Sequence, residues 1–379
     1  MSESAGGTDK IVIPADLLPA DGRFGSGPTK IRKEQVEALA AAGQTLLGTS
    51  HRQAPVRNLV QRVREGLAAL FGLPDDYLVV IGNGGTTAFW ESAAFGLISG
   101  RAQHLSFGEF SSKFAKVTQV APWLADPSVI KSEPGTHPQP RAEAGIDAYA
   151  LTHNETSTGV AMPVRRVSGA DAGALVLVDA TSAAGGMAVH PAEFDAYYFA
   201  PQKCFGSDGG LWLALLSPAA VQRAAQIADS GRYIPAFLSL QTAIDNSRLQ
   251  QTYNTPALAT LIMLAEQIDW MLSQGGMAWT TERTATSSGI LYDWAEKSPV
   301  ATPFVTDPSQ RSRVAPTIDF EGSVDAKRLS AVLRANGIVD TGAYAKLGRN
   351  QLRIGTFPAV DPADVEALTA CIDYVLDRM

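Results

Sequence analysis

Lys203 stands where a lysine could do covalent chemistry. It follows residues 196–200, an apolar and aromatic run that predicts a buried strand, with Pro201 and Gln202 in between. A lysine that a strand carries into a cavity can form a Schiff base with a carbonyl compound once its amine is neutral. Burial and nearby positive charge favour that form, because they lower the pKa from its usual value of about 10.4. Most lysines are solvated surface charges, so this interpretation depends on what surrounds Lys203.

Asp179 is the acid that gives Lys203 a chemical partner. It follows residues 175–178, a β-branched run that predicts a second buried strand. By itself, an acid after a strand is more often a turn residue or a helix N-cap. A buried carboxylate together with a lysine, however, fits pyridoxal phosphate. The ring nitrogen of this cofactor must stay protonated to draw electrons, and a lysine amine holds its aldehyde. The same amine could then move the proton on the substrate's Cα.

A glycine-rich turn could hold the phosphate of such a cofactor. Residues 78–81 predict a strand, residues 82–87 a turn with the sequence Gly-Asn-Gly-Gly-Thr-Thr, and residues 88–94 the start of a helix. Backbone N–H groups at a helix N-terminus and nearby threonine hydroxyls bind anions. The turn does not match the dinucleotide-binding fingerprint, because Thr87 replaces its third glycine, and no Gly-Lys-Ser/Thr follows as in a Walker loop. A strand-to-helix turn without a ligand is the alternative.

Strands and helices alternate from about residue 55 to residue 270, which predicts a mostly parallel sheet. Residues 148–152 and 211–216 predict two further strands of this sheet. Ligands of such sheets bind at the carboxyl ends of the strands. Thr156, Asp179 and Lys203 each follow a strand, so we expect them to share one crevice.

The pattern changes from about residue 275. Short strands are predicted within residues 314–320 and 351–356, and helices at residues 325–334 and after Asp361-Pro362. We therefore predict an α/β fold of two domains. It comprises an N-terminal tail at residues 1–22, a large domain with a mostly parallel sheet at residues 23–274, and a smaller α+β domain at residues 275–379.

Composition bounds the class of protein. The net charge of −7 argues against a nucleic-acid or anionic-membrane partner. The 2 cysteines and 5 histidines are scattered, so neither a disulfide framework nor a metal site is predicted. Residues 258–272 are apolar, but they include Glu266 and Asp269 and fall short of the ~20 residues that a membrane span needs. Residues 1–10 predict a disordered tail without the apolar core of a signal peptide. We expect a cytoplasmic protein.

Several motifs together resemble a known family. Their order and spacing are similar to those of the phosphoserine aminotransferases, which are class V members of the fold-type I pyridoxal phosphate enzymes. The resemblance covers nearly the whole chain. It is carried by Phe24-Gly25-Ser26-Gly27-Pro28, Ser50-His51-Arg52, Asn154-Glu155-Thr156, Asp179, Gln202-Lys203 and Tyr253-Asn254-Thr255-Pro256.

The resemblance implies a cofactor site. Lys203 would form the aldimine, Asp179 would pair with the pyridine nitrogen, and Thr156 would bond the ring hydroxyl. Phe110 falls where many relatives have tryptophan and would stack on the pyridine, although a buried core phenylalanine is an equal alternative. The cofactor phosphate would be held by Gly84, Gly85, Thr86 and Gln202, and by Asn254 and Thr255 of the other subunit of a homodimer.

The resemblance also implies a substrate site made of Ser26, His51, Arg52 and Arg353. Arg353 would bind the substrate carboxylate through a bidentate pair of hydrogen bonds. The alternative, without the family context, is an exposed arginine on a strand. His51 and Arg52 would meet the substrate phosphate and are otherwise two loop charges near a helix start. Many relatives carry a His-Arg pair where this chain has Lys346-Leu347. Lys346 or Arg349 could supply the missing charge.

The function implied by the resemblance is transamination between glutamate and 3-phosphohydroxypyruvate, which gives O-phosphoserine and 2-oxoglutarate in serine biosynthesis, with ping-pong kinetics. The alternatives are another class V activity, such as a serine- or alanine-glyoxylate aminotransferase, and a nucleotide-binding module without pyridoxal phosphate. A cysteine desulfurase needs a mobile nucleophilic cysteine. Cys371 is predicted inside the last helix and Cys204 adjoins Lys203, so neither suits that role.

Overall fold

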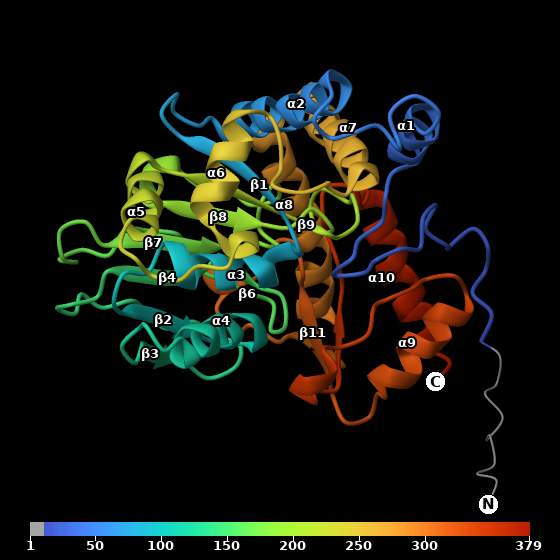
Figure 1. Cartoon of the computed structure of the whole chain (residues 1–379). Coiled ribbons are helices and arrows are strands. Elements are labelled where there is room, and N and C mark those ends of the chain that lie inside the picture. Colours follow the sequence, from blue (N-terminus) through green and yellow to red (C-terminus); the bar gives the residue numbers. More distant parts are fainter. Residues whose placement is uncertain (1–10) are drawn as a thin grey trace, which may run out of the picture.

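A sheet of seven strands organises the larger part of the computed structural model, which describes residues 11–379 (Figure 1). The tail predicted at residues 1–10 lies outside the described residues. The strand order is β1-β9-β8-β7-β4-β2-β3, and all the strands run in one direction except β9, which is antiparallel to both of its neighbours. The seven strands are β1 (Leu78–Asn83), β2 (Ala102–Ser106), β3 (Ser128–Lys131), β4 (Ala148–Thr152), β7 (Leu175–Asp179), β8 (Ala196–Phe199) and β9 (Leu211–Leu216).

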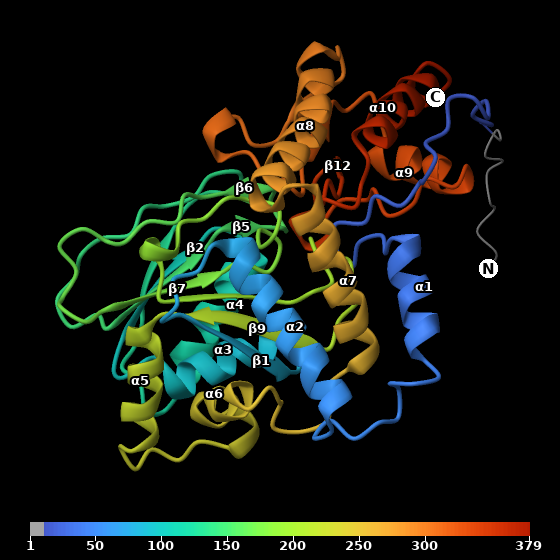
Figure 2. The same cartoon turned by 90° about the horizontal axis from the view of Figure 1, so that it is seen from above.

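Both faces of this sheet are covered by helices, which is why its strands are apolar runs. Along β7, Val176 and Val178 pack into the core on one face, while Leu175 and Leu177 pack into the core on the other. The first face is covered by α2 (Ala54–Phe71) and α7 (Leu258–Gln274), which lie side by side in Figures 1 and 2. The second face is covered by α3 (Gly85–Gly96), α4 (Glu109–Val120), α5 (Pro218–Ala228) and α6 (Leu240–Arg248).

The direction of the strands decides where a ligand can bind. Because β1, β4, β7 and β8 point the same way, their carboxyl ends open onto one edge of the sheet. The segments that follow these ends are the glycine-rich turn, the Asn154–Thr156 region, Thr181 and Lys203. The predicted α/β architecture with a mostly parallel sheet is therefore confirmed.

The C-terminal part of the chain has a separate apolar core. Ile318, Leu333 and Val375 are among its buried members, and Ile13 from the N-terminal segment joins them. Figures 1 and 2 place α9 and α10 next to the C-terminus, away from the large sheet. The elements of this part are α8 (Gly276–Lys297), β10 (Ala301–Pro303), β11 (Thr317–Phe320), α9 (Ala326–Ala335), β12 (Gln351–Arg353) and α10 (Pro362–Leu376). The domain boundaries at residues 22 and 274 stay a prediction.

The remaining elements are short or peripheral. They are α1 (Lys33–Ala42), the antiparallel pair β5 (Asn154–Glu155) and β6 (Val160–Ala161), and the 3-10 turns η1 (Pro191–Glu193), η2 (Ala236–Leu238), η3 (Pro308–Gln310) and η4 (Ala345–Leu347). Of these turns, η4 lies between α9 and β12. The apolar stretch at residues 258–272 belongs to α7, which packs against the sheet. Within residues 11–379, no helix combines the length and the hydropathy that crossing a membrane requires.

Candidate active site

A cavity of about 460 Å³ lies at the carboxyl ends of the parallel strands. It collects residues from β4, β7 and the segments after β1 and β8, together with the first turns of α3 and α4. Eight of the residues that the sequence singled out lie in its wall. These are Gly84, Gly85, Thr86, Phe110, Thr156, Asp179, Gln202 and Lys203.

The Lys203 amine points into this cavity and is held by the backbone. Its Nζ donates a hydrogen bond to the carbonyl oxygen of Ser26 at 2.7 Å. Removal from water and, to a smaller extent, the positive charge of Arg353 lower the pKa of Lys203 to about 8. A Cβ atom on Gly27 would lie 1.8 Å from Nζ, and the φ of Gly27 is +132°, so the lysine needs a glycine here.

The Asp179 carboxylate is 5% exposed and is held by three donors. Its Oδ1 accepts from the backbone N–H of Thr181 at 2.9 Å and from the Thr181 hydroxyl at 2.6 Å. Its Oδ2 accepts from the indole N–H of Trp90 at 2.9 Å. Burial raises the pKa of Asp179, and the hydrogen bonds from Thr181 and Trp90 oppose that shift.

Sequence reasoning missed both Trp90 and Thr181. A signal was available for Trp90, because it lies in the helix predicted from residue 88, four residues after Thr86 of the turn, a spacing that puts two residues on one helix face. Thr181 also approaches that turn, since its Oγ1 lies 2.9 Å from Oγ1 of Thr86. The Thr181 hydroxyl thus connects the Asp179 carboxylate to the glycine-rich turn.

The glycine-rich turn begins α3 and exposes its first N–H groups to the cavity. Gly84 and Gly85 have φ values of +108° and +70°, which glycine adopts without strain. A Cβ atom at Gly84 would also lie 2.7 Å from Cβ of Ala88. The free N–H groups and the helix dipole favour an anion at this end of the cavity, where Thr86 and Thr87 also form part of the wall.

The wall near Thr156 is fixed through Ser182. The Ser182 hydroxyl accepts hydrogen bonds from Nδ2 of Asn154 at 2.9 Å and from Oγ1 of Thr156 at 2.8 Å. Two buried oxygens of this wall, Oδ1 of Asn154 and Oε1 of Gln202, accept no hydrogen bond from the residues that the structure describes. Buried acceptors without donors are costly, so both oxygens are open to a hydrogen bond from a bound group or water.

These residues fit pyridoxal phosphate. An anion site at the start of α3 suits the phosphate, and the Asp179 carboxylate suits a protonated ring nitrogen. Lys203 offers the amine for the aldehyde, and Phe110 offers an aromatic face. Each group lies in the wall of the same cavity.

Arg353 lies at the end of β12, near a second hollow of about 430 Å³ that Ser26 also lines. Its Nη1 donates to the carbonyl oxygen of Thr156 at 3.0 Å, while its buried Nε has no acceptor within the described part of the chain. The guanidinium carbon lies 5.2 Å from the ring centroid of Tyr344, whose ring is in turn 6.1 Å from that of Phe110. Sequence reasoning did not single out Tyr344, which thus lies between Arg353 and Phe110.

Six of the predicted site residues do not line this cavity: Ser26 and Arg353 line the neighbouring hollow, and four others line neither. Oγ1 of Thr255 lies 3.4 Å from Nδ1 of His51, and the Asn83 side chain donates to Oδ1 of Asn254. His51, Arg52, Asn254 and Thr255 are absent from the residues that line the cavity. Their roles at the cofactor and the substrate stay a prediction.

The two candidates for the missing positive charge lie in different surroundings. Arg349 forms an ion pair with Asp319 and stacks over the ring of Phe304, 4.4 Å from its centroid. Lys346, in η4, forms an ion pair of 2.5 Å with Glu109, next to Phe110. The same carboxylate lies 3.4 Å from Nζ of Lys113, which lines the cavity. Arg349 is thus engaged elsewhere, whereas Lys346 lies near the cavity.

The two cysteines are poor nucleophiles. Cys204 and Cys371 are both buried and free, and burial raises the pKa of each thiol above its usual value. Cys371 lies within α10, as the sequence predicted. A thiolate is the nucleophilic form of cysteine, so neither residue suits a desulfurase.

Comparisons with known proteins agree with this geometry. The class-V aminotransferase family matches residues 140–367. A phosphoserine aminotransferase from a Nocardioides species is 66% identical over 373 residues, which cover 98% of this chain and 100% of that protein. The crystal structure of a phosphoserine aminotransferase from Cytophaga hutchinsonii, 21% identical, has a TM-score of 0.86 and covers 93% of this chain and 99% of that one.

A second solved structure, of pyridoxal phosphate-bound phosphoserine aminotransferase from Trichomonas vaginalis, has a TM-score of 0.79 at 17% identity. It covers 93% of this chain and 99% of that one. The fold is that of the fold-type I aminotransferases. The chain therefore belongs to the phosphoserine aminotransferase family and is a class V, pyridoxal phosphate-dependent aminotransferase.

Proposed function

We propose that this aminotransferase exchanges an amino group between glutamate and 3-phosphohydroxypyruvate, giving O-phosphoserine and 2-oxoglutarate. The observation that carries the proposal is the placement of the Lys203 amine, the Asp179 carboxylate and the N-terminus of α3 around one cavity. The name of the relative that is 66% identical over its full length supports the choice of substrate. A reducing cytoplasm is the compartment that we propose for it, since Cys204 and Cys371 are free.

The roles of the chain's own residues follow from the geometry. Bound pyridoxal phosphate supplies an aldehyde for the amino group and a protonated ring that draws electrons from the bonds at Cα. Nζ of Lys203 holds the cofactor and moves the proton at Cα, and its lowered pKa leaves a useful fraction of the amine neutral near pH 7. Asp179 keeps the ring nitrogen protonated, while Phe110 packs against the ring.

Substrate recognition divides between a carboxylate end and a phosphate end. Arg353 binds the carboxylate that glutamate and the keto acid share, because its guanidinium lies beside the cavity and its Nε has no acceptor among residues 11–379. Lys346 supplies positive charge for the phosphate, from its place beside Glu109 and Phe110. His51 and Arg52 of a second subunit complete the phosphate site.

The active form is a homodimer with shared sites. Three large apolar side chains near the glycine-rich turn and the Asn254 segment are widely exposed, namely Phe237 at 48%, Leu249 at 57% and Tyr253 at 48%. The Phe237 ring borders the turn itself, with its Cζ 3.6 Å from where a Cβ of Gly84 would lie. A second copy that covers this surface would bring its own Asn254 and Thr255 to the phosphate end of the cavity.

Hybrid dimers test the sharing of sites. A protein with Asn254→Ala and Thr255→Ala is mixed with a Lys203→Ala protein, and each alone is expected to have little activity. After subunit exchange, one site of each hybrid dimer has Lys203 from the first protein and intact Asn254 and Thr255 from the second. About half of the dimers are hybrids, and each hybrid has one intact site of two. Activity should therefore return to about a quarter of the wild-type value. If heterodimers form without any recovery, each site is built within one chain.

A panel of keto acids with and without a phosphate, with glutamate as donor, tests the substrate. Arg52→Ala should lower kcat/KM for the phosphorylated keto acid by about tenfold to a hundredfold, since a hydrogen bond to a charged group contributes roughly 1.5 to 3 kcal/mol. The rate with a phosphate-free keto acid should hardly change, because its carboxylate still meets Arg353. Equal losses for both classes of substrate would refute the phosphate role and favour a glyoxylate-type aminotransferase.

A further inference from the structure

Glu155 is a completely buried carboxylate next to the cavity but outside its wall. It is 0% exposed and stands between Asn154 and Thr156, both of which line the cavity. No lysine or arginine forms an ion pair with it anywhere in residues 11–379. An unpaired buried charge is costly unless hydrogen bonds stabilise it, so the donors around Glu155 define what it does.

Those donors come from the first turn of α4 and from the segment that follows β5. Oε2 of Glu155 accepts from the backbone N–H of Phe110 at 3.1 Å, and from the N–H and hydroxyl of Ser111 at 2.9 and 3.0 Å. Oε1 accepts from the N–H and hydroxyl of Ser157 at 3.1 and 2.7 Å. The Ser157 hydroxyl also accepts from the N–H of Glu109 at 3.0 Å. The free N–H groups that begin α4 are thus satisfied by these two side chains.

The backbone is shaped to let Glu155 reach this helix. A Cβ atom on Gly108 would lie 2.3 Å from Cγ of Glu155 and 2.6 Å from the hydroxyl oxygen of Ser157. The φ of Gly108 is 179°, which any residue adopts, so space and not conformation requires the glycine. A side chain at this position would push the carboxylate away from the N–H groups of α4.

The segment around Glu155 also holds the substrate-binding arginine. The carbonyl oxygen of Thr156 accepts the hydrogen bond from Nη1 of Arg353. Residues 155 and 156 therefore hydrogen-bond to two distant parts of the chain: Glu155 to the backbone of Phe110, and Thr156 to the guanidinium of Arg353. The negative charge of Glu155 also acts on the pKa of Arg353, raising it against the lowering effect of burial.

We propose that Glu155 is a positioning residue of the transamination site, which fixes the first turn of α4 so that the Phe110 ring meets the cofactor and keeps residues 154–157 in place for Arg353. The inference rests on the proposed placement of the cofactor ring beside Phe110. The anchoring itself can be measured without cofactor, so a failure of the inference is distinguishable from a failure of the proposed function.

Glu155→Gln is the first test. All five hydrogen bonds to the Glu155 carboxylate come from donors. A glutamine amide would place its NH₂ group against a backbone N–H group in either orientation, so hydrogen bonds on that side would be lost. Hydrogen exchange of the cofactor-free protein should be about tenfold to a hundredfold faster in the first turn of α4 and unchanged in β7. The dissociation constant of pyridoxal phosphate should rise at least about tenfold, with an altered circular dichroism band of the bound cofactor.

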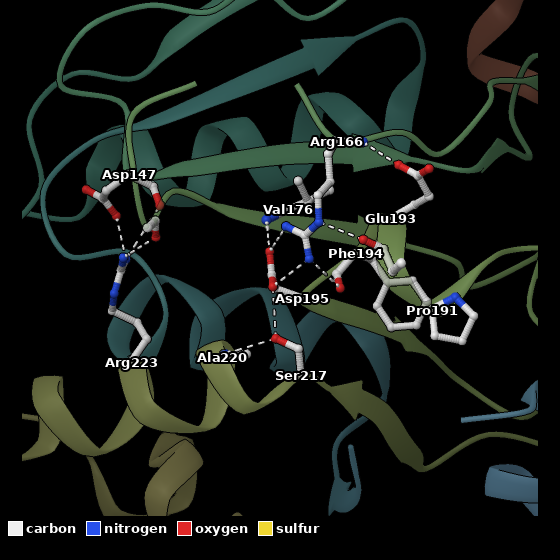
Figure 3. Close-up of polar contacts among 12 residues, drawn as sticks. Asp147, Arg166, Val176, Pro191, Glu193, Phe194, Asp195, Ser217, Ala220 and Arg223 are labelled. Carbon is white, nitrogen blue, oxygen red and sulfur yellow. Dashed lines mark hydrogen bonds and ion pairs between the residues drawn. The ribbon is translucent and has the colours of Figure 1, made fainter. Parts of the chain in front are cut away.

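Asp195→Asn is the matched control, because Asp195 is also a buried carboxylate. Figure 3 shows it between the Arg166 guanidinium, which donates two hydrogen bonds of 2.8 and 3.0 Å, and the hydroxyl of Ser217 at 2.9 Å. Asp195 does not line the cavity. Its replacement should lower the melting temperature without changing exchange in α4 or the circular dichroism of the cofactor.

Gly108→Ala tests the same anchor without removing a polar group, and it decides the matter if Glu155→Gln does not fold. It should reproduce the faster exchange in α4 and the altered cofactor band, because its methyl group displaces Glu155. The inference is wrong if the folded variants differ from the wild type only in melting temperature, as the Asp195→Asn protein should.

Discussion

Lys203→Ala is expected to remove nearly all transamination while leaving a protein that still binds pyridoxal phosphate. Proton transfer by a positioned side chain contributes roughly 10²- to 10⁴-fold to a rate, and Lys203 would also be the covalent anchor, so kcat should fall by at least that factor. The anion site at the start of α3 and the Asp179 carboxylate remain for binding. Single-turnover kinetics with glutamate measures the loss, and borohydride reduction followed by peptide mapping should find the pyridoxyl group on Lys203 in the wild type.

Lys113→Ala is the control for that experiment, because Lys113 is a second lysine in the wall of the same cavity. It should keep the covalent attachment. The pKa of about 8 also gives a pH dependence: the neutral amine predominates above pH 8, so attachment of pyridoxal phosphate to the cofactor-free protein should accelerate as the pH rises through 8 and then level off. A pyridoxyl group on any lysine other than Lys203 would show that Lys203 is not the covalent anchor.

Asp179→Asn is expected to have the second largest effect. Thr181 and Trp90 donate three hydrogen bonds that reach both carboxylate oxygens. The NH₂ group of an asparagine would therefore face a donor in either orientation and could not accept its hydrogen bond. The negative charge that keeps a ring nitrogen protonated is lost as well. We expect kcat to fall by roughly 10²- to 10³-fold, as when a preorganised electrostatic partner is removed, and the affinity for the cofactor to fall by about tenfold or more.

Absorbance titration with pyridoxal phosphate and steady-state kinetics measure these two losses. Asp195→Asn again serves as control, because it makes the same chemical change in a buried carboxylate away from the cavity. Its melting temperature should fall, with kcat near that of the wild type. A comparable loss of kcat in the two variants would mean that Asp179 acts through stability alone.

The sequence by itself was enough to predict the elements that carry the site. The runs that end at Asp179 and just before Lys203 are buried on both faces of the sheet, and such strands are continuous apolar segments that can be recognised without a structure. The glycine-rich turn was recognisable because Gly84 and Gly85 adopt positive φ values that other residues avoid. Since neighbouring parallel strands point the same way, the convergence of Thr156, Asp179 and Lys203 followed from the order of elements.

Only the tertiary structure decided which side chains support those residues. Trp90 is far in sequence from Asp179, and Glu155 is far from the first turn of α4, so an indole or a carboxylate in a helix or short strand carries no local sign of such a partner. The same is true of Arg349 and Lys346, because the choice of one ion-pair partner over another changes the free energy by only about 0 to 1 kcal/mol at an exposed site. Such pairings depend on how distant segments pack, which the pattern of apolar residues does not specify.

The position of His51 and Thr255 likewise depends on how distant segments of the chain pack. The two residues meet each other outside the lining of the Lys203 cavity, although the sequence motifs around them suggested a single site. A motif indicates which chemistry a residue type can perform, but the packing of α2 and of the segment before α7 determines where its side chain lies. Sequence pattern therefore determined the strands, the turn and the reactive pair. The tertiary structure decided their supporting contacts, and it placed His51, Arg52, Asn254 and Thr255 outside the lining of the cavity, because apolar patterns do not specify how the loops that carry them pack.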